Sequence, residues 1–342
     1  MSIRPGDVER PVSNLRIGFS YDCKEEYLAA GCSALDVMEF DSAETIAGIE
    51  RGLQALGHEV TRVAPGVELA RRLAAGERWD LVFSIAEGLR GRSREAQVPA
   101  LCELFGQPYV FSDPLTCALT LDKALTKRVV RDCGLPTAPF AVAGSIPELH
   151  NVSVPAPLFL KPVSEGSSKG ITARSLVSRR EDLVEAGSEL LDQFRQPLLV
   201  EAYLPGREVT VGILGTGANA RVLGVMEIVF TPRAEAPAYT TLNKDEYEQR
   251  VAYRLVNGEP MGQLAATSAL AAYRALGCRD AGRVDLRCDT SGTPCFLEIN
   301  PLPGLDPVRS DLPILTRLAG RSYEWLLGEI LASAAGRAGT HG

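Results

Sequence analysis

The 342-residue sequence predicts an α/β protein that begins with a parallel sheet, and three observations lead to this class. The first block, residues 1–119, alternates apolar strand-like segments with amphipathic helical segments, which is the order that produces parallel strands. The second block, residues 120–204, and the third, residues 205–342, combine strands with helices. In the third block, two apolar runs flank a short turn-rich connector, which predicts a β-hairpin.

Composition limits the class of protein and of partner. Hydrophobic residues make up 45% and charged residues 23%, close to the average for soluble globular proteins. A net charge of −7 without a Lys/Arg run argues against a nucleic-acid partner. No stretch approaches the roughly 20 apolar residues that span a bilayer, and the first residues lack the apolar core of a signal peptide. We therefore expect a cytoplasmic protein with no membrane partner.

The cysteines and histidines do not suggest a metal site. The eight cysteines are scattered without a C-x-x-C pair, and there are only three histidines. Zinc sites need clustered Cys and His ligands at short spacings. We expect buried, reduced thiols instead.

The alternation in the first block can be followed along the chain. Leu15–Phe19 predicts a short strand. Asp41 and Glu44 predict a capping box, which opens a helix with one apolar face formed by Ile46, Ile49, Leu53 and Leu56. Gly57 ends this helix, and Glu59–Val63 predicts the next strand.

The rest of the first block contains a buried strand and the loop after it. Asp80–Ile85 is apolar enough for a buried strand, and Ala86–Glu95 forms the following loop. A helix near Ala96–Phe105 and a strand near Pro108–Phe111 complete the block. Ligands of parallel sheets collect where strands end in loops.

The second block opens with a helix over Leu121–Cys133, which Gly134 and Pro136 end. The other elements expected in the second and third blocks are strands at Leu158–Pro162 and Pro197–Tyr203 and helices near Glu181–Phe194, Met261–Leu276 and Tyr323–Ser333.

The predicted hairpin is the most informative stretch. Its strands are Val284–Cys288 and Cys295–Ile299. If Asp289 and Pro294 flank a four-residue loop, Asp285 falls opposite Glu298, and Asn300 shares the face of Glu298 because side chains repeat every two positions. Two neighbouring carboxylates repel each other unless a cation joins them, and hard oxygen ligands suit Mg²⁺. Spacing alone also allows a solvent-facing strand with incidental acids, but the Pro-Leu-Pro-Gly turn that follows favours function.

A glycine- and serine-rich loop follows the first strand of the second block. The stretch PLFLKPVSEGSSKGI contains Gly166, Ser167, Ser168 and Gly170. Such a loop lets backbone N–H groups approach phosphate oxygens closely, and Lys161 adds positive charge. The spacing is not that of a Walker A motif. Taken alone, the loop is also compatible with an ordinary hairpin turn.

The pattern R-x-D, followed later by E-x-N and P-G, resembles the metal-binding segment of the ATP-grasp ligases, and within that superfamily the D-alanine–D-alanine ligases. By this resemblance Asp285 and Asn300 each hold one Mg²⁺ ion and Glu298 bridges both, with Mn²⁺ as an alternative metal. Arg283 steadies the acyl phosphate and the tetrahedral intermediate derived from it.

The resemblance implies an ATP-grasp architecture. An N-terminal parallel α/β domain, residues 1–119, precedes a central subdomain, residues 120–204, that contains the phosphate flap. The C-terminal subdomain, residues 205–342, contains the Mg²⁺-binding hairpin. The two α+β subdomains clamp ATP between them.

The resemblance also assigns ATP contacts. The motif K-P-x-x-E-G-S-S-x-G is the flap over the phosphates, where Glu165 orients Lys161 or the flap itself. The backbone of the hinge strand reads adenine while Glu201 reaches its amino group, and Glu208 meets the ribose hydroxyls. The implied ATP-binding set is Lys123, Lys161, Glu165, Ser167, Ser168, Glu201, Tyr203, Leu204 and Glu208.

The implied catalytic candidates are Arg283, Ser167 and Lys244. Lys244 belongs to the segment Glu235–Tyr247, which corresponds to a lid loop whose register is left open.

The amino-acid pockets depart from the family pattern. The family's H-G-x-x-G-E-D-G loop is replaced by Ala86–Glu95, and an unusual insertion runs through Phe40. The candidates for substrate contacts are Glu87, Arg92, Glu95, Gly304 and Arg309. Surface ion pairs are the alternative interpretation of the charged ones among them.

The expected function is ATP-dependent joining of two amino acids through an acyl phosphate, with release of ADP and phosphate. The alternatives are a ligase of another amino acid or amine in secondary metabolism, a small-molecule kinase on the same fold, and a nucleotide-binding protein without catalysis. The resemblance further implies a possible homodimer.

Overall fold

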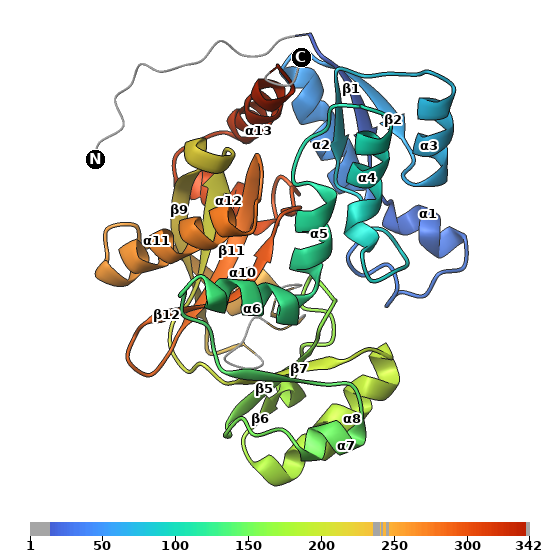
Figure 1. Cartoon of the computed structure of the whole chain (residues 1–342). Helices are drawn as coiled ribbons and strands as arrows, with labels where there is room; N and C mark the ends of the chain where they lie inside the picture. The colour runs from blue at the N-terminus through green and yellow to red at the C-terminus, as the bar shows by residue number, and fades with distance from the viewer. Residues whose placement is uncertain (1–13, 235–239, 241, 244–245, 340–342) are drawn as a thin grey trace.

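The computed structural model describes residues 14–234, 240, 242–243 and 246–339. Three sheets organise this part of the chain, and they lie within residues 16–84, 140–202 and 208–300 (Figure 1). None of the helices described there is long and apolar enough to cross a membrane. All eight cysteines are free thiols, and most of them are buried.

The first sheet is parallel, as expected. Its order is β2-β1-β3, and β1 pairs in parallel with both neighbours. The strands are β1 (Arg16–Ser20), β2 (Glu59–Val63) and β3 (Leu81–Ser84). The helices of this region are α1 (Lys24–Ala29), α2 (Ala43–Ala55), α3 (Val67–Ala74) and α4 (Gln97–Leu104), the last preceded by a 3₁₀ turn at Arg94–Ala96.

Helix α2 begins one residue later than the capping-box prediction. Ser42, not Asp41, is the N-cap, because the Ser42 hydroxyl accepts a hydrogen bond from the Thr45 N–H at 3.2 Å. Asp41 remains extended, since its carbonyl accepts from the Lys24 N–H at 2.9 Å in a bridge to the α1 segment. Its carboxyl group is thereby free of any capping role.

One further prediction is corrected, and the bounds of another are refined. The strand expected near Pro108–Phe111 is a single parallel bridge between Tyr109 and Val82, because Phe111 adopts a left-handed φ of 75° that ends the extended run. The helix expected over Leu121–Cys133 is present as α6 (Lys123–Asp132), and a separate helix, α5 (Pro114–Leu121), which was not predicted, precedes it. Asp122 separates them and caps α6 by accepting from the Leu125 N–H.

The second sheet is antiparallel and is covered by helices α7 (Ile146–His150) and α8 (Leu183–Phe194) (Figure 1). Its order is β4-β7-β5-β6. The strands are β4 (Phe140–Ala143), β5 (Leu158–Pro162), β6 (Leu176–Val177) and β7 (Leu198–Ala202). The glycine- and serine-rich loop leaves this sheet at the end of β5.

The third sheet is antiparallel with the order β10-β9-β8-β11-β12. Its strands are β8 (Glu208–Leu214), β9 (Arg221–Phe230), β10 (Val251–Leu255), β11 (Ala281–Cys288) and β12 (Pro294–Asn300), with the short helix α10 (Tyr247–Arg250) before β10. Helix α11 (Pro260–Ala275) covers one face and α12 (Asp311–Leu318) the other. Gly212 and Gly224 are paired across β8 and β9, and a Cβ on either would lie within 3.0 Å of Leu315. These glycines therefore let α12 approach the sheet.

The last helix packs against the N-terminal region of the chain. Helix α13 (Tyr323–Gly339) packs against α2, so close that a Cβ on Gly52 would lie 2.5 Å from Leu327. A single buried cluster contains residues of β1, β3, α2, α12 and α13. Two cavities lie among the three sheets. The boundaries at 119/120 and 204/205 stay predictions.

Candidate active site

The hairpin of β11 and β12 brings the predicted metal ligands together. Asp285 pairs directly with Glu298, and Arg283 pairs with Asn300. Within the strands, positions 283 and 285 share a face, as do 298 and 300. The two carboxylates and the amide therefore meet on one patch.

A bulge, rather than the loop length, produces this pairing. Cys288 pairs with Pro294, so the loop has five residues instead of the expected four. The register then shifts, because Leu286 pairs with Phe296 while Asp285 pairs with Glu298. One extra residue on β12 absorbs the difference. Without the bulge, Glu298 would lie on the opposite face of the hairpin from Asp285.

Arg283 is held tightly beside the predicted metal ligands. Its Nη2 lies 3.0 Å from Asp285 Oδ2, and its Nη1 lies 2.9 Å from Asp311 Oδ2. The Thr210 hydroxyl also donates to Asp285, and the Asn300 amide nitrogen lies 3.4 Å from it. Burial lowers the pKa of Arg283, but Asp285 and Asp311 together raise it by more than burial lowers it. The net shift of the pKa is therefore upward, and the guanidinium remains charged.

The flap loop has an unusual backbone. Ser167 and Ser168 both adopt left-handed conformations, with φ values of 46° and 59°. Residues other than glycine rarely do so, and such strain gathers at ligand clamps. The Glu165 carboxylate pairs with Lys169 at 2.7 Å and accepts from the Gln196 amide at 2.6 Å. Glu165 is thus paired with the flap residue Lys169, whereas Lys161 pairs with Glu201.

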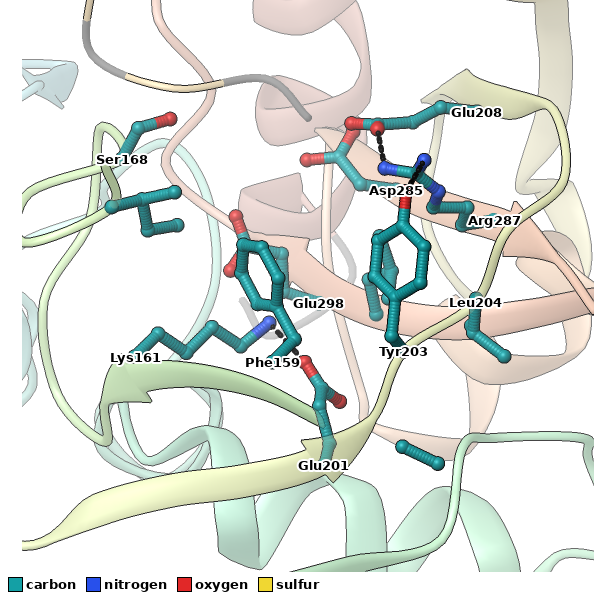
Figure 2. Close-up of a pocket in the computed structure, with 13 residues that line it drawn as sticks. Phe159, Lys161, Ser168, Glu201, Tyr203, Leu204, Glu208, Asp285, Arg287 and Glu298 are labelled. Carbon is teal, nitrogen blue, oxygen red and sulfur yellow. Dashed lines mark hydrogen bonds and ion pairs between the residues drawn. The ribbon is translucent and has the colours of Figure 1, made fainter. Parts of the chain in front are cut away.

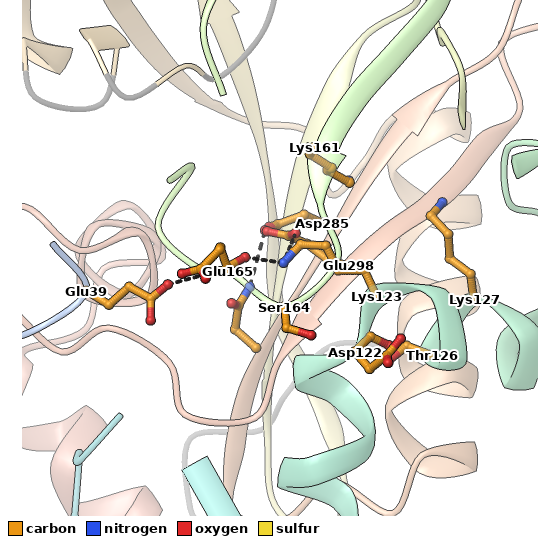
Figure 3. Close-up of polar contacts among 12 residues, drawn as sticks. Glu39, Asp122, Lys123, Thr126, Lys127, Lys161, Ser164, Glu165, Asp285 and Glu298 are labelled. Atoms are coloured by element: carbon orange, nitrogen blue, oxygen red, sulfur yellow. Dashed lines mark hydrogen bonds and ion pairs between the residues drawn. The ribbon is translucent and has the colours of Figure 1, made fainter. Parts of the chain in front are cut away.

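Lys123 connects the flap to the hairpin. Its Nζ donates to the Glu165 carbonyl and lies 3.4 Å from Glu298 Oε2 (Figure 3). Lys123 is the first residue of α6, directly after the Asp122 cap. One ammonium therefore lies between the predicted phosphate loop and the predicted metal-bridging residue.

Side chains of the N-terminal region contact the flap. Glu39, at the end of the insertion, accepts from the Gly166 N–H at 2.5 Å and pairs with Arg94 at 2.8 Å. Arg94 in turn donates to the Ser164 carbonyl at 3.0 Å. Both side chains are almost fully buried. Residues of the first block therefore hold the flap in place.

A narrow cleft lies between the second and third sheets. The rings of Phe159 and Tyr203 stack at 6.4 Å, and the Arg287 guanidinium lies 5.0 Å from the Tyr203 ring (Figure 2). Arg287 also pairs with Glu208 at 2.9 Å. The other lining residues are Lys161, Ser168, Ile171, Glu201, Ala202, Leu204, Asp285, Leu297 and Glu298. Such a slot, apolar at one end and charged at the other, suits a nucleotide.

Glu201 is the centre of a buried ion triad at the floor of this cleft. Its two carboxylate oxygens lie 2.8 Å from Lys127 Nζ and 2.9 Å from Lys161 Nζ (Figure 2 shows the Lys161 contact). Burial alone would raise the pKa of Glu201, but the two lysines lower it, so the carboxylate stays ionised. The side chain predicted to reach adenine is thus engaged with two ammonium groups.

Glu208 titrates differently although it has a cationic partner. Burial raises its pKa to about 7, and the neighbouring Asp285 and Glu298 add to this effect, while Arg287 opposes it. The acidic face of the hairpin therefore extends to the predicted ribose contact. A cation bound there would favour the ionised form of Glu208.

A second, larger cavity of about 650 Å³ opens between the first and third sheets. Its wall includes the predicted residues Lys123, Glu165, Ser167, Arg283, Glu298, Asn300, Glu87, Glu95, Gly304 and Arg309. Arg92 is not part of this wall. Its side chain is 72% exposed and pairs with Asp122 at 2.7 Å, so it matches the surface ion-pair alternative. Lys244 lies outside the described residues.

Sequence reasoning missed several charged residues in or beside the two cavities. Arg287 continues the period-two series of Arg283 and Asp285 on β11, and Lys127 follows Lys123 by one helical turn; both spacings could have indicated them. Asp311, which pairs with Arg283, has no such signal. Glu39 could not have been found either, because the insertion does not match the family pattern.

The donor set fits Mg²⁺ rather than a transition metal. Across the described ranges, no group of three or more His, Cys, Asp or Glu side chains is arranged to hold a metal ion. The hairpin instead offers two carboxylates and one amide, and Mg²⁺ commonly binds through one or two carboxylates together with substrate phosphates.

Known proteins resemble this chain in sequence and in fold. The family model described as "D-ala D-ala ligase C-terminus" matches residues 129–332. The D-alanine–D-alanine ligase of Bordetella pertussis is 37% identical over 292 residues, which cover 84% of this chain and 88% of that ligase. The crystal structure of the Bacillus anthracis D-alanine–D-alanine ligase complexed with ATP matches with a TM-score of 0.71 at 21% identity, over 96% of this chain and 100% of that one. The VanG D-Ala:D-Ser ligase of Enterococcus faecalis matches with a TM-score of 0.70 at 20% identity, over 94% and 100% of the two chains.

The structural matches show that the fold is the expected ATP-grasp fold, with a parallel sheet and two antiparallel sheets. The sequence matches extend over most of the chain and include the flap and the hairpin. The chain therefore belongs to the D-alanine–D-alanine ligase family and is an ATP-dependent amino-acid ligase.

Proposed function

We propose that this chain joins two amino acids at the junction of the cleft and the cavity, with ATP and two Mg²⁺ ions as cofactors. One observation supports this proposal above the others: Glu298 lines both the narrow cleft and the larger cavity. A nucleotide in the cleft and an amino acid in the cavity would meet beside this residue. The Bacillus anthracis relative was crystallised with ATP, which agrees with a nucleotide in this cleft.

The residues of the hairpin would hold the metal. Asp285, Glu298 and Asn300 supply hard oxygen ligands, and bound Mg²⁺ would neutralise phosphate charge. Mn²⁺ could occupy the same ligands. The remaining neutralisation comes from Lys123 and Lys161, whose ammonium groups lie beside Glu298 and in the cleft respectively.

The other cleft residues position the nucleotide. Phe159 and Tyr203 form walls for the base, with the Tyr203–Leu204 backbone as its hydrogen-bonding edge. Glu208 lines the cleft and is the proposed contact for the ribose. Glu201 keeps Lys161 in place through their 2.9 Å contact, in addition to its predicted contact with adenine.

The reaction proceeds in two steps. A carboxylate oxygen of the first amino acid attacks the γ-phosphorus of ATP, and ADP leaves. The amine of the second amino acid, having lost its proton, attacks the acyl carbon, and phosphate leaves with both electrons of the broken C–O bond. Arg283 faces the cavity beside this centre and stabilises the developing negative charge. The flap, with Ser167, excludes water that would hydrolyse the acyl phosphate.

Arg309 and Gly304 line the cavity beyond the hairpin and are the proposed contacts for the second substrate's carboxylate. The names of the relatives make D-alanine the first substrate to test. We further propose that the protein works in the cytoplasm and forms a homodimer. Neither proposal affects the chemistry at the site.

Phosphate release tests this function. The full chain is incubated with ATP, Mg²⁺ and pairs of D- or L-amino acids, and the products are identified by mass. A ligase releases free phosphate, whereas a kinase transfers it to the acceptor. We expect Glu298→Ala to abolish ADP release, and Arg309→Ala to change the amino-acid preference. Unchanged ADP release in the folded Glu298→Ala variant would contradict the site.

A further inference from the structure

The wall of the cavity that comes from the first block contains three acidic side chains without a partner. Asp41 precedes α2, Glu87 follows β3, and Glu95 lies in the 3₁₀ turn before α4. All three line the cavity. Among the residues that the structure describes, none of these side chains makes a hydrogen bond or an ion pair. Glu95 is only 9% exposed, and this exposure is toward the cavity.

The neighbouring acids differ from these three because each has partners. Asp22 accepts from the Tyr27 hydroxyl at 2.6 Å and from the Gly88 N–H at 2.8 Å. Glu39 is held by Arg94 and Gly166, as described above. Asp306 accepts from the Thr45 hydroxyl at 2.7 Å.

The neighbouring cations do not neutralise the three carboxyls. Arg94 is engaged by Glu39 and by the Ser164 carbonyl, and Lys123 is engaged by the Glu165 carbonyl and by Glu298. Lys24 and Arg309 also line the cavity, yet neither forms an ion pair with the three carboxyls within the described ranges. Lys24 lies near enough to Asp41 to lower its pKa, but burial and the neighbouring Asp306 raise that pKa to about 7. The three carboxyls therefore have no ion-pair partner among the described residues.

The titration of the other two groups agrees with this geometry. Burial raises the pKa of Glu95 to about 7, with Glu39 adding to the shift while Arg94 and Lys123 oppose it. Burial also raises the pKa of Glu87, and Glu95, Glu39 and Asp41 add to it. Glu87 is thus close enough to Glu95 and to Asp41 for their charges to repel, and a cation among them would relieve that repulsion.

We propose that this cavity binds an amino acid with a second ammonium group, a diamino acid of the 2,3-diaminopropionate class. This inference rests on the proposed function. Two amino-acid substrates bring at most two α-ammonium groups, and one of these must lose its proton before it attacks. Three unpartnered carboxyls exceed that number. A neutral side chain would leave a buried carboxylate without compensation, which is costly, whereas a side-chain ammonium would pair with it.

Binding affinity tests the inference directly. Calorimetric titration of the full chain, with ADP and Mg²⁺ present, compares both enantiomers of 2,3-diaminopropionate with those of serine. These two amino acids have the same number of heavy atoms and differ in a side-chain ammonium against a hydroxyl. We expect one enantiomer of the diamino acid to bind about 10- to 100-fold more tightly than the matching serine, the range of a charged hydrogen bond.

Variants locate the effect. Glu95→Gln and Glu87→Gln are each expected to reduce the preference for the diamino acid over serine at least about tenfold, because each removes a charge without changing the shape of the side chain. Glu44→Gln is the matched control: Glu44 is exposed, lies on α2 and does not line the cavity, so the preference should not change. Each variant's urea unfolding midpoint is measured first. Because the two glutamates are replaced in separate variants, the test can still be made if one variant fails to fold.

The outcomes separate this inference from the proposed function. Serine binding as tightly as the diamino acid would overturn the inference, even if serine or alanine supports phosphate release. Preferential binding of the diamino acid that Glu95→Gln and Glu87→Gln both leave unchanged would overturn it too. Preferential binding that depends on these glutamates, without phosphate release for any pair of amino acids, would support the inference and overturn the proposed function.

Discussion

In the narrow cleft, each buried carboxylate has a cationic partner: Glu201 pairs with two lysines, Glu208 with Arg287 and Asp285 with Arg283. In the cavity beside it, Asp41, Glu87 and Glu95 have none within the described residues. The two regions meet at Glu298. The difference indicates that the protein itself supplies the counter-charges of the cleft, whereas the three carboxyls of the cavity have no counter-charge from a paired side chain.

The paired region should be the more sensitive to loss of one charge. Glu201→Gln would leave Lys127 and Lys161 buried without a carboxylate, and breaking a buried ion pair in this way costs about 3–5 kcal/mol. Urea unfolding at neutral pH measures this loss. Adding Lys127→Met to the variant should recover part of it. A loss below about 1 kcal/mol, the worth of a surface pair, would show that the triad does not stabilise the fold.

The unpartnered region should respond to pH. The pKa of Glu95 is raised to about 7, so between pH of about 4 and 7 the unfolded chain releases a proton that the folded chain retains. This contribution to stability is fully present below pH of about 4 and is lost as the pH rises through 7. Glu95→Gln should flatten the fall of the unfolding free energy in that window by up to about 1.4 kcal/mol per pH unit.

Urea midpoints at several pH values between 5 and 8 give the slope. Asp41, whose pKa is raised to about 7, titrates in the same window, so part of the slope should remain in the Glu95→Gln variant. An unchanged slope would mean that Glu95 is already paired or ionised in the folded chain.

The contact between Glu39 and the flap joins the two regions. Glu39→Gln removes the charge that holds Arg94 and the Gly166 N–H, so the flap should loosen. We expect the KM for ATP to rise up to about tenfold, which corresponds to one hydrogen bond to a charged group. Glu185→Gln, whose side chain is 78% exposed on α8, serves as the control. An unchanged KM for ATP together with unchanged proteolysis at the flap would show that the Glu39 contact does not hold the flap.

Arg92 should give the smallest effect. Its pair with Asp122 is at the surface, where such pairs contribute about 0–1 kcal/mol. Arg92→Ala should leave kcat and the substrate preference unchanged and lower stability by less than about 1 kcal/mol. A clear rise of the KM for an amino acid would instead show that Arg92 reaches the substrate during the reaction.

The sequence by itself determined the elements with strong local signals. Glu59–Val63 and Leu158–Pro162 are strands at the predicted residues, because apolar β-prone runs are bounded there by turn residues. It also determined the hairpin of β11 and β12, because two apolar runs flank a turn-rich connector there. These features depend on neighbours in the chain, and a local pattern is enough to specify them.

Only the tertiary structure decided how distant charges combine. The bulge on β12 sets the face of Glu298, and contacts between residues far apart in the chain join Glu39 to the flap and Lys127 to Glu201. The Asp122 cap likewise starts α6 at Lys123, whose ammonium group lies beside Glu298. Whether a carboxyl is neutralised or left alone depends on which side chains the packed sheets bring near it. That is a property of three-dimensional burial and not of spacing along the chain.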